Sequence, residues 1–388
     1  MAADRVLLKF ILLFTIALLA GCGWFSKDNT RVPTELQHIE QTLQVREVWQ
    51  GSSGAGIGER YLRLYPMLVG ERLYLINANG GVKAMLSDQG EPLWDMEIEA
   101  AVSAGLNGNE ELLVFGTEEG DAIALSADDG RELWRKRLSS EIVAVSQADL
   151  GVVAVRTNDS KVYGLDTGNG EVIWQLSRKA PVLTLKGASV PIVNSGKLVV
   201  GFDDGKLGVF SMLSGNTLWQ TTLGVPKGRS ELERMVDIDS ALKVRDGIIY
   251  AVGLHSQVAA ITLIEGRVLW SREISSYTGL DVGESRVFVT DEDDQVWALD
   301  RRTGASLWKQ EKLKYRKLTS PAAIQDFIVV GDFEGYVHWL AKSDGHLVAR
   351  TPIGSDGILT TPKVVESRAY VLGKGGDFVV LDIASEQE

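Results

Sequence analysis

The sequence of 388 residues predicts an all-β protein, namely an eight-bladed β-propeller of four-stranded antiparallel blades. Three observations predict this fold. A glycine, three further residues and a tryptophan recur at intervals of about 40 residues. Short runs of alternating apolar residues precede each copy of this motif. The first and the last copies are incomplete in complementary ways, which indicates that the two ends of the chain close a ring.

The repeat is marked by tryptophans that we expect to dock between neighbouring blades. They are Trp49, Trp94, Trp134, Trp174, Trp219, Trp270 and Trp308, and one more unit ends near Ala349. Upstream of these positions lie runs such as "AIAL", "VYGL" and "VWAL", whose period of two is typical of half-buried strands. A tryptophan on the outermost strand of each blade would bury a large apolar area between blades, so a structural role is expected for it.

One unit, residues 197–221, can be interpreted strand by strand. We expect strands at 197–201, 206–211 and 217–221, with a tight turn at Asp203-Asp204-Gly205 between the first two. An inner strand around 189–193 precedes them. Four antiparallel strands in about 40 residues have the size of one propeller blade.

The two chain ends predict how the ring closes. Residues 43–50 supply a last strand without the three strands that should precede it, whereas residues 353–384 supply three strands and stop before a fourth. We therefore expect one blade shared between these two segments, which leaves no open sheet edge in the ring. The propeller is predicted to span residues 43–384.

The first residues predict a signal peptide and a lipid anchor. Arg5 and Lys9 precede an apolar run from Phe10 to Ala20 that is too short to span a bilayer. The segment then ends in Leu19-Ala20-Gly21-Cys22, which resembles the lipobox of bacterial lipoproteins. We expect residues 1–21 to be a signal peptide and Cys22 to carry a diacylglyceryl lipid, although an ordinary secretory signal with a chance cysteine is the alternative.

Residues 22–42 would form the lipidated N-terminus and a linker, in which residues 34–43 could form one helical turn or two. Gly23 stands where lipoproteins retained in the inner membrane usually have aspartate. This implies a lipid-anchored protein of the outer membrane that faces the periplasm.

Composition excludes several classes of function. The net charge of -12 argues against nucleic-acid binding, and a single cysteine excludes a disulfide framework and a cysteine-based metal site. The four histidines are scattered without metal-ligand spacing. We therefore predict no catalytic residue, no metal site and no cofactor.

Two motifs invite a functional interpretation, and each has a plainer one. "GAGIGER" at 54–60 mimics a dinucleotide-binding loop but lacks a βαβ unit, so a flexible loop is expected. "DEDDQ" at 291–295 suggests a Ca²⁺ site but holds the position of a blade turn and lacks the closing glutamate of an EF-hand, so a solvated turn is expected.

The repeat itself resembles the tryptophan-docking repeat of quinoprotein propellers, most closely in "ALDRRTGASLW" at 298–308. That resemblance leaves a periplasmic quinoprotein-type enzyme as one alternative, and a ligand-binding propeller lipoprotein as another. Many alcohol-oxidising quinoproteins use adjacent cysteines near the quinone, and no cysteine remains here for that purpose.

The whole chain resembles the BamB family, the propeller lipoproteins of the β-barrel assembly machinery of Gram-negative outer membranes. The resemblance rests on the lipobox, the bare propeller, and "SELERMVDIDS" at 230–240 with "LTSPAAIQDFIVVGDFEGYVHWL" at 318–340. It implies a non-enzymatic scaffold that binds the POTRA repeats of BamA, aids folding and insertion of barrel proteins and could hold unfolded ones. The contact residues that the resemblance implies are Leu183, Leu185, Lys186, Asp237 and Asp239.

Two features qualify this contact. The family more usually has arginine at the position of Lys186, and arginine alone offers a planar fork for bidentate hydrogen bonds. The longest interval of the repeat, from Trp219 to Trp270, contains an insertion at 224–240 that is expected to form a loop or short helix at one rim.

Overall fold

A computed structural model describes residues 31–58, 60–178, 189–226, 229–230, 235–238 and 240–384 of the chain. The chain divides into two compact units, Met1–Pro33 and Thr34–Glu388. Only residues 31–33 of the first unit are described, and they form no helix or strand.

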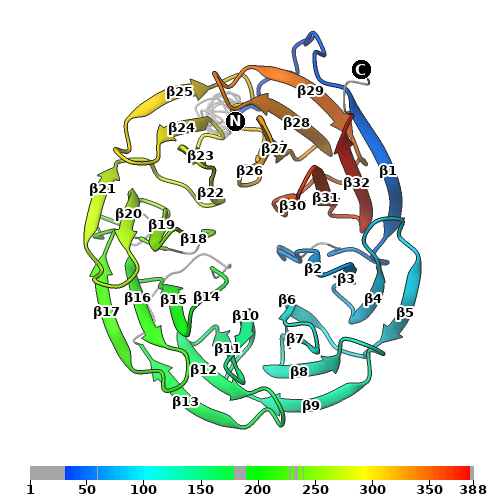
Figure 1. The fold of residues 1–388 in the computed structure, drawn as a ribbon, viewed down its shortest axis with the longest axis vertical. Helices are drawn as coiled ribbons and strands as arrows, with labels where there is room; N and C mark the ends of the chain where they lie inside the picture. The colour runs from blue at the N-terminus through cyan, green and yellow to red at the C-terminus, as the bar shows by residue number, and fades with distance from the viewer. Residues whose placement is uncertain are drawn as a thin grey trace, which may run out of the picture. The chain divides into compact units, whose positions relative to one another are not determined.

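The second unit is an eight-bladed β-propeller of four-stranded antiparallel sheets, as predicted (Figure 1). In seven blades the strands pair in chain order from the inner to the outer strand. Blades 1 and 2 contain β2 (Met67–Val69), β3 (Arg72–Ile76), β4 (Gly81–Leu86), β5 (Pro92–Glu97), and β6 (Val102–Gly108), β7 (Leu112–Thr117), β8 (Asp121–Ser126), β9 (Glu132–Arg137). Blades 3 and 4 contain β10 (Ile142–Asp149), β11 (Val152–Thr157), β12 (Lys161–Asp166), β13 (Val172–Ser177), and β14 (Ile192–Asn194), β15 (Lys197–Gly201), β16 (Lys206–Ser211), β17 (Thr217–Thr222).

The remaining blades follow the same plan. Blades 5 and 6 contain β18 (Lys243–Arg245), β19 (Ile248–Ala251), β20 (Val258–Thr262), β21 (Val268–Arg272), and β22 (Gly279–Val282), β23 (Arg286–Thr290), β24 (Val296–Asp300), β25 (Ser306–Gln310). Blades 7 and 8 contain β26 (Ala322–Ile324), β27 (Phe327–Gly331), β28 (Tyr336–Ala341), β29 (Leu347–Pro352), and β30 (Lys363–Val365), β31 (Arg368–Leu372), β32 (Asp377–Ile383), β1 (Val45–Ser52). The strands expected in residues 197–221 match β15 to β17 within one residue, and the inner strand lies slightly later than expected.

The eighth blade is shared between the two chain ends, which confirms the predicted closure. β1 pairs antiparallel with β32, from Val45 opposite Ile383 to Ser52 opposite Asp377. Figure 1 shows β1 beside β32, so that the outer strand comes from the start of the chain. Pairing across the two ends satisfies the edge of β32 and locks the ring.

Each tryptophan of the repeat docks onto the next blade, and the glycine of that blade's motif receives it. A Cβ added to Gly90 would lie 2.7 Å from Cε3 of Trp49, and one on Gly130 would lie 2.8 Å from Cε3 of Trp94. The same contact joins Gly170 to Trp134, Gly215 to Trp174, Gly266 to Trp219, Gly304 to Trp270 and Gly345 to Trp308. All these glycines have positive φ, which is a second reason why the position excludes a side chain.

A hydrogen bond fixes each docked ring as well. The indole N–H of Trp174, for example, donates to the carbonyl of Met212 in the next blade at 2.8 Å. The six other docking tryptophans donate in the same way, to the carbonyls of Ser87, Ala127, Thr167, Leu263, Arg301 and Lys342. A buried indole N–H needs such a partner, so the bond sets the orientation of the ring as well as its depth.

The joint between blades 7 and 8 uses a different tryptophan, which the repeat did not reveal. Ala349 holds the tryptophan position of blade 7 and pairs with Trp339 on β28. In the other blades the tryptophan pairs with a small or medium residue on the third strand, such as Ala84 or Gly164. Large and small residues have therefore exchanged strands, and the fully buried Trp339 fills the joint from the third strand.

The N-terminal segment 34–44 covers the same joint from outside. The backbone N–H groups of Thr42 and Leu43 both donate to the carbonyl of Val348, at 3.0 and 3.2 Å. Leu43 also packs against the apolar cluster of blades 7 and 8. No helical turn forms over residues 34–43, because their backbone groups bond to blade 7 and its neighbouring connection.

Within the described residues, no helix is long and apolar enough to cross a membrane.

The docking role of the tryptophans is open to a stability test. Replacing Trp174 by alanine removes a ring that is 8% exposed and empties one joint, so we expect a loss of about 3–5 kcal/mol in the free energy of unfolding. Chemical denaturation measures this loss. The neighbouring Ile173 is 48% exposed, and Ile173→Ala should change stability by no more than about 0.5 kcal/mol. Equal effects of the two substitutions would contradict the docking role.

Candidate partner-binding site

The antiparallel order of the strands gathers two sets of loops on one face of the ring. The connection that enters each blade and the turn between its second and third strands both lie at the same strand ends. We call this the entry face. The two segments with predicted contact residues, 178–191 and 223–242, connect β13 to β14 and β17 to β18, so their described ends lie at the entry face.

The structure places one of the five predicted contact residues. Leu183, Leu185, Lys186 and Asp239 lie outside the described residues, as does part of the insertion at 224–240. Asp237 is described and is only 1% exposed. A residue so deeply buried cannot present a large surface to a partner while its segment keeps this conformation.

The short segment Met235–Ile238 is anchored into the ring on both sides. The N–H of Asp237 donates to the carbonyl of Leu254 at 3.3 Å, and the N–H of Ile238 donates to the carbonyl of Phe202 at 3.3 Å. A Cβ on Gly253 would lie 1.8 Å from the Asp237 carbonyl, so glycine permits the close approach of the two backbones. Met235–Ile238, which we call the base of the insertion, is therefore fixed to blades 4 and 5 by backbone hydrogen bonds.

The turn of blade 4 beside this base is held by two arginines from blade 3. Arg178, just after β13, donates to Asp204 at 3.0 Å, and its guanidinium lies 3.9 Å from the centre of the Phe202 ring. Arg156 is 2% exposed, pairs with Asp203 and donates to the Gly201 carbonyl at 3.0 Å. Arg178 is also the last described residue before the segment that holds Leu183, Leu185 and Lys186. The rim where that segment begins is therefore rigidly attached to blade 4.

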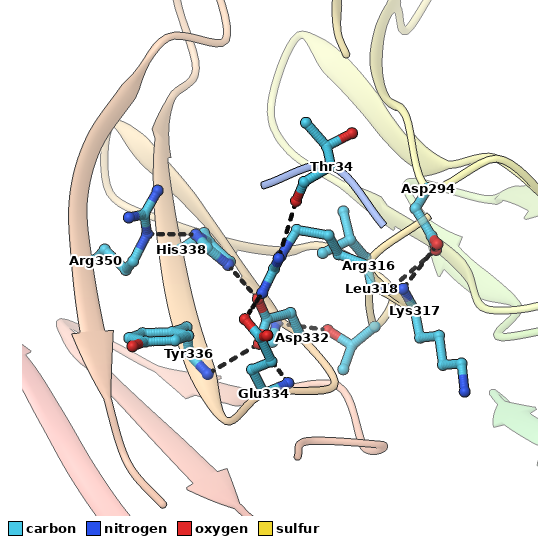
Figure 2. Close-up of polar contacts among 12 residues, drawn as sticks. Thr34, Asp294, Arg316, Lys317, Leu318, Asp332, Glu334, Tyr336, His338 and Arg350 are labelled. Carbon is cyan, nitrogen blue, oxygen red and sulfur yellow. Dashed lines mark hydrogen bonds and ion pairs between the residues drawn. The ribbon is translucent and has the colours of Figure 1, made fainter. Parts of the chain in front are cut away.

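A second polar cluster on the entry face holds the N-terminal segment (Figure 2). Arg316 is 2% exposed and donates to Asp332 at 2.9 Å and to the carbonyl of Thr34 at 3.0 Å. His338, fully buried, lies 2.9 Å from Asp332 through Nε2 and accepts a 3.4 Å contact from Arg350 through Nδ1. The bonds from Arg316 to Thr34 and from Arg350 to Gln37 join this cluster to the N-terminal segment.

The electrostatics of this cluster agree with a neutral histidine beside an ionised aspartate. Burial lowers the pKa of His338 and outweighs the opposing effect of Asp332. Burial alone would raise the pKa of Asp332, but hydrogen bonds from His338, Tyr336 and Arg316 hold it below its ordinary value. The neutral ring then donates from Nε2 and accepts at Nδ1, which fits both contacts.

Comparison with known proteins assigns the chain to a family. Residues 78–310 match the family model described as outer membrane protein assembly factor BamB. A Pseudomonas aeruginosa protein of that name is 45% identical over 97% of this chain and 99% of the relative, and one from Kangiella koreensis is 43% identical over 96% and 95%. The crystal structure of BamB from Moraxella catarrhalis superposes with a TM-score of 0.80 at 26% identity, over 88% of this chain and all of that one.

The chain belongs to the BamB family. The resemblance predicted from the sequence is thereby confirmed.

The acidic turn at 291–295 is more deeply buried than the solvated turn expected from the sequence. Asp294 is 3% exposed, and its carboxylate accepts the N–H groups of Lys317 and Leu318 at 2.7 and 2.9 Å and the Tyr277 hydroxyl at 3.2 Å. The connection that enters blade 7 folds over this turn, and no local sequence pattern predicts that contact. Across the described part of the chain, no group of three or more potential metal ligands gathers.

The "GAGIGER" segment is likewise structural. The Ser53 N–H donates to Gly376 and the Ile57 N–H donates to Lys374, at 2.9 and 3.1 Å, which ties the loop to the last turn of blade 8. Gly54, Gly56 and Gly58 have positive φ. The glycines let the chain pass tightly from the shared blade into blade 1, so the flexible loop expected there is in fact packed.

The buried Asp294 predicts a pH-dependent stability. Burial raises its pKa from 3.8 to about 6 in the folded protein. The folded state therefore holds more protons than the unfolded state between these values, and its stability falls as the pH rises through this window. Between pH 4.5 and 7.5, the free energy of unfolding of the wild type should fall by about 2 kcal/mol relative to that of Asp294→Asn. Urea denaturation at each pH measures both values. Parallel pH profiles of the two proteins would contradict the raised pKa.

Proposed function

We propose that the chain is a non-enzymatic scaffold lipoprotein of the outer-membrane protein assembly complex. In this proposal a lipid on Cys22 anchors it to the outer membrane, with the propeller in the periplasm, and the connections that enter blades 4 and 5 bind the POTRA repeats of BamA. The observation that carries the proposal is the match to assembly factors over nearly the full length of both chains.

The architecture supports binding through the entry face. Loops on a rigid framework keep their positions, and the base of the insertion is fixed by backbone hydrogen bonds at Asp237 and Ile238. Arg178 fixes the neighbouring rim through Asp204 and Phe202. We propose that the contact itself is made by Leu183, Leu185, Lys186 and Asp239. The buried Asp237 would support the contact indirectly, by holding the segment Met235–Ile238 in place.

The proposal that the chain is no enzyme draws on the polar clusters. The buried His338 and Asp332 bond to each other, Asp332 also accepts from Arg316, and His338 accepts from Arg350. The carboxylate of Asp294 is occupied by two backbone N–H groups and a tyrosine hydroxyl. A quinoprotein-type enzyme remains the rival, and reconstitution with quinone and Ca²⁺ followed by an optical titration would reveal a redox-active chromophore if that rival were correct.

A second role, holding unfolded outer-membrane proteins, is favoured by one observation. The residue before the docking tryptophan is an exposed apolar side chain in six blades, with exposed fractions from 40% to 51%, at Leu93, Leu133, Ile173, Leu218, Leu269 and Leu307. These side chains lie on the outermost strands, whose outer edges could pair with an extended chain.

Purification from membranes in mild detergent tests the main proposal. The tagged protein should recover a large barrel protein that carries POTRA repeats, and Cys22→Ser should release the protein from the membrane fraction. Recovery of the protein alone would contradict the scaffold role, and membrane retention of Cys22→Ser would contradict the lipid anchor.

The contact residues can be tested with purified POTRA repeats. We expect Leu183→Ala, Leu185→Ala and Lys186→Ala together to weaken binding at least tenfold, about 1.4 kcal/mol, with an unchanged melting temperature. Glu311→Ala with Lys312→Ala, exposed in the connection that enters blade 7, is the matched control and should leave the affinity unchanged.

The two aspartates need different substitutions in this binding experiment. Asp239→Arg tests a direct contact, whereas an arginine at the buried position 237 would disturb the fold, so Asp237→Asn is the suitable change there. Unaltered affinity of both the triple variant and Asp239→Arg would refute the assignment of this rim.

A further inference from the structure

The centre of the ring contains a cavity of about 840 Å³. Inner strands of all blades but one, blade 7, and several entry connections line it. Figure 1 shows these inner strands facing the centre of the ring. The volume lies within the range of sites that hold small molecules, about 300–1,000 Å³.

The two halves of the ring give this cavity opposite character. The inner strands of blades 5 and 8 contribute Lys243 and Lys363 to the lining, and Asp281 lies on the inner strand of blade 6 beside Lys243. Lys243 pairs with Asp281 at 3.1 Å, and Asp281 also accepts the N–H of Ala323 in blade 7 at 2.7 Å. One carboxylate therefore serves the two lysines, and Lys363 makes no ion pair with any residue that the structure describes.

The half-ring formed by blades 1 to 4 is mostly apolar at its wall. Leu68, Leu106, Val143, Val145 and Ile192 line the cavity from four successive inner strands. The acidic lining residues of this half lie at the ends of the strands, where Glu118 pairs with Arg60 at 3.0 Å.

A strap crosses the mouth of the cavity on the entry face. It consists of residues 53–66, the connection from β1 to β2, of which all but residue 59 are described. Arg63 donates to the carbonyl of Tyr277 at 2.8 Å, and Tyr277 lies in the connection that enters blade 6. Blades 1 and 6 are not neighbours in the ring, so this bond spans the opening and brings a further cation to it.

We propose that the central cavity binds a small amphipathic anion, with its carboxylate or phosphate between Lys363 and Lys243 and its apolar body against the wall of blades 1 to 4. The local charge at the two lysines supports an anionic head group, since Lys363 has no ion-pair partner among the described residues, whereas the lining glutamates, Glu110, Glu118 and Glu141, lie in the opposite half of the ring. The apolar wall supports a hydrocarbon body, which would bury surface worth about 0.8 kcal/mol per CH₂.

The titration of Lys363 agrees with this arrangement. Lys363 is an exposed residue at the start of β30. The surrounding chain, followed by the nearby charge of Lys243, lowers its pKa, and Asp281 only partly opposes the shift. A bound anion would add attraction to both lysines where the free protein has only repulsion between them.

Calorimetric titration with dodecanoate tests the proposal. The mature chain with Cys22→Ser keeps every described residue and avoids competition from its own lipid or from detergent. We expect one dodecanoate per chain, with at least tenfold weaker binding of dodecanol, which lacks the charge, and of inorganic phosphate, which lacks the apolar body. Equal affinity for dodecanoate and either of these two probes, or no binding of dodecanoate, would overturn the proposal.

Two variants locate the site. Lys363→Gln with Lys243→Gln should weaken dodecanoate binding at least tenfold, while the matched control Lys312→Gln, on the exposed rim, should stay within twofold of wild type. Because Lys243 supports Asp281, the single variant Lys363→Arg serves as a second measurement that preserves the charge, and it should retain binding. Undiminished binding by the double variant would overturn the proposal. The titration involves neither lipid nor POTRA repeats, so its outcome is independent of the proposed scaffold role.

Discussion

The contact between a tryptophan on one blade and a glycine on the next is the constraint on which the ring depends. It supplies apolar burial, a hydrogen bond from the indole N–H and a fixed spacing in one place. Since the glycine also needs positive φ and the absence of a Cβ, neither partner can be replaced alone without disturbing the joint. Seven such contacts join eight blades, and one joint has to be made otherwise.

That remaining joint is also where the described chain enters and leaves the ring. Trp339 fills it from the third strand, opposite Ala349, and the backbone of Thr42 and Leu43 closes over Val348 from outside. The segment upstream is then held by Arg316 at Thr34 and by Arg350 at Gln37. Closure of the ring and attachment of its N-terminal segment therefore use the same blade. Residues 34–43 are attached to blade 7 by these hydrogen bonds.

The fold could be predicted from the sequence because the same pattern of strands, turns and motif recurs from blade to blade. The blade count and the shared blade followed from the spacing and from the incomplete ends. The direction of docking could not be predicted in this way. Within one motif the glycine lies four residues before a tryptophan, but in the structure it contacts the tryptophan of the preceding blade. Trp339 was missed, although its exchange with Ala349 could have been found by comparing residues ten places before each tryptophan. The burial of Asp237 and Asp294 depends on connections from other blades, which a single sequence does not show.

The antiparallel order of the strands places several features on a single face. The connections into blades 4 and 5, the strap at 53–66 and the bond between Thr34 and Lys314 all lie at the entry face. The proposed partner contact and the mouth of the cavity would then share one side of the ring, so a partner bound at the connections into blades 4 and 5 would lie beside the opening of the cavity.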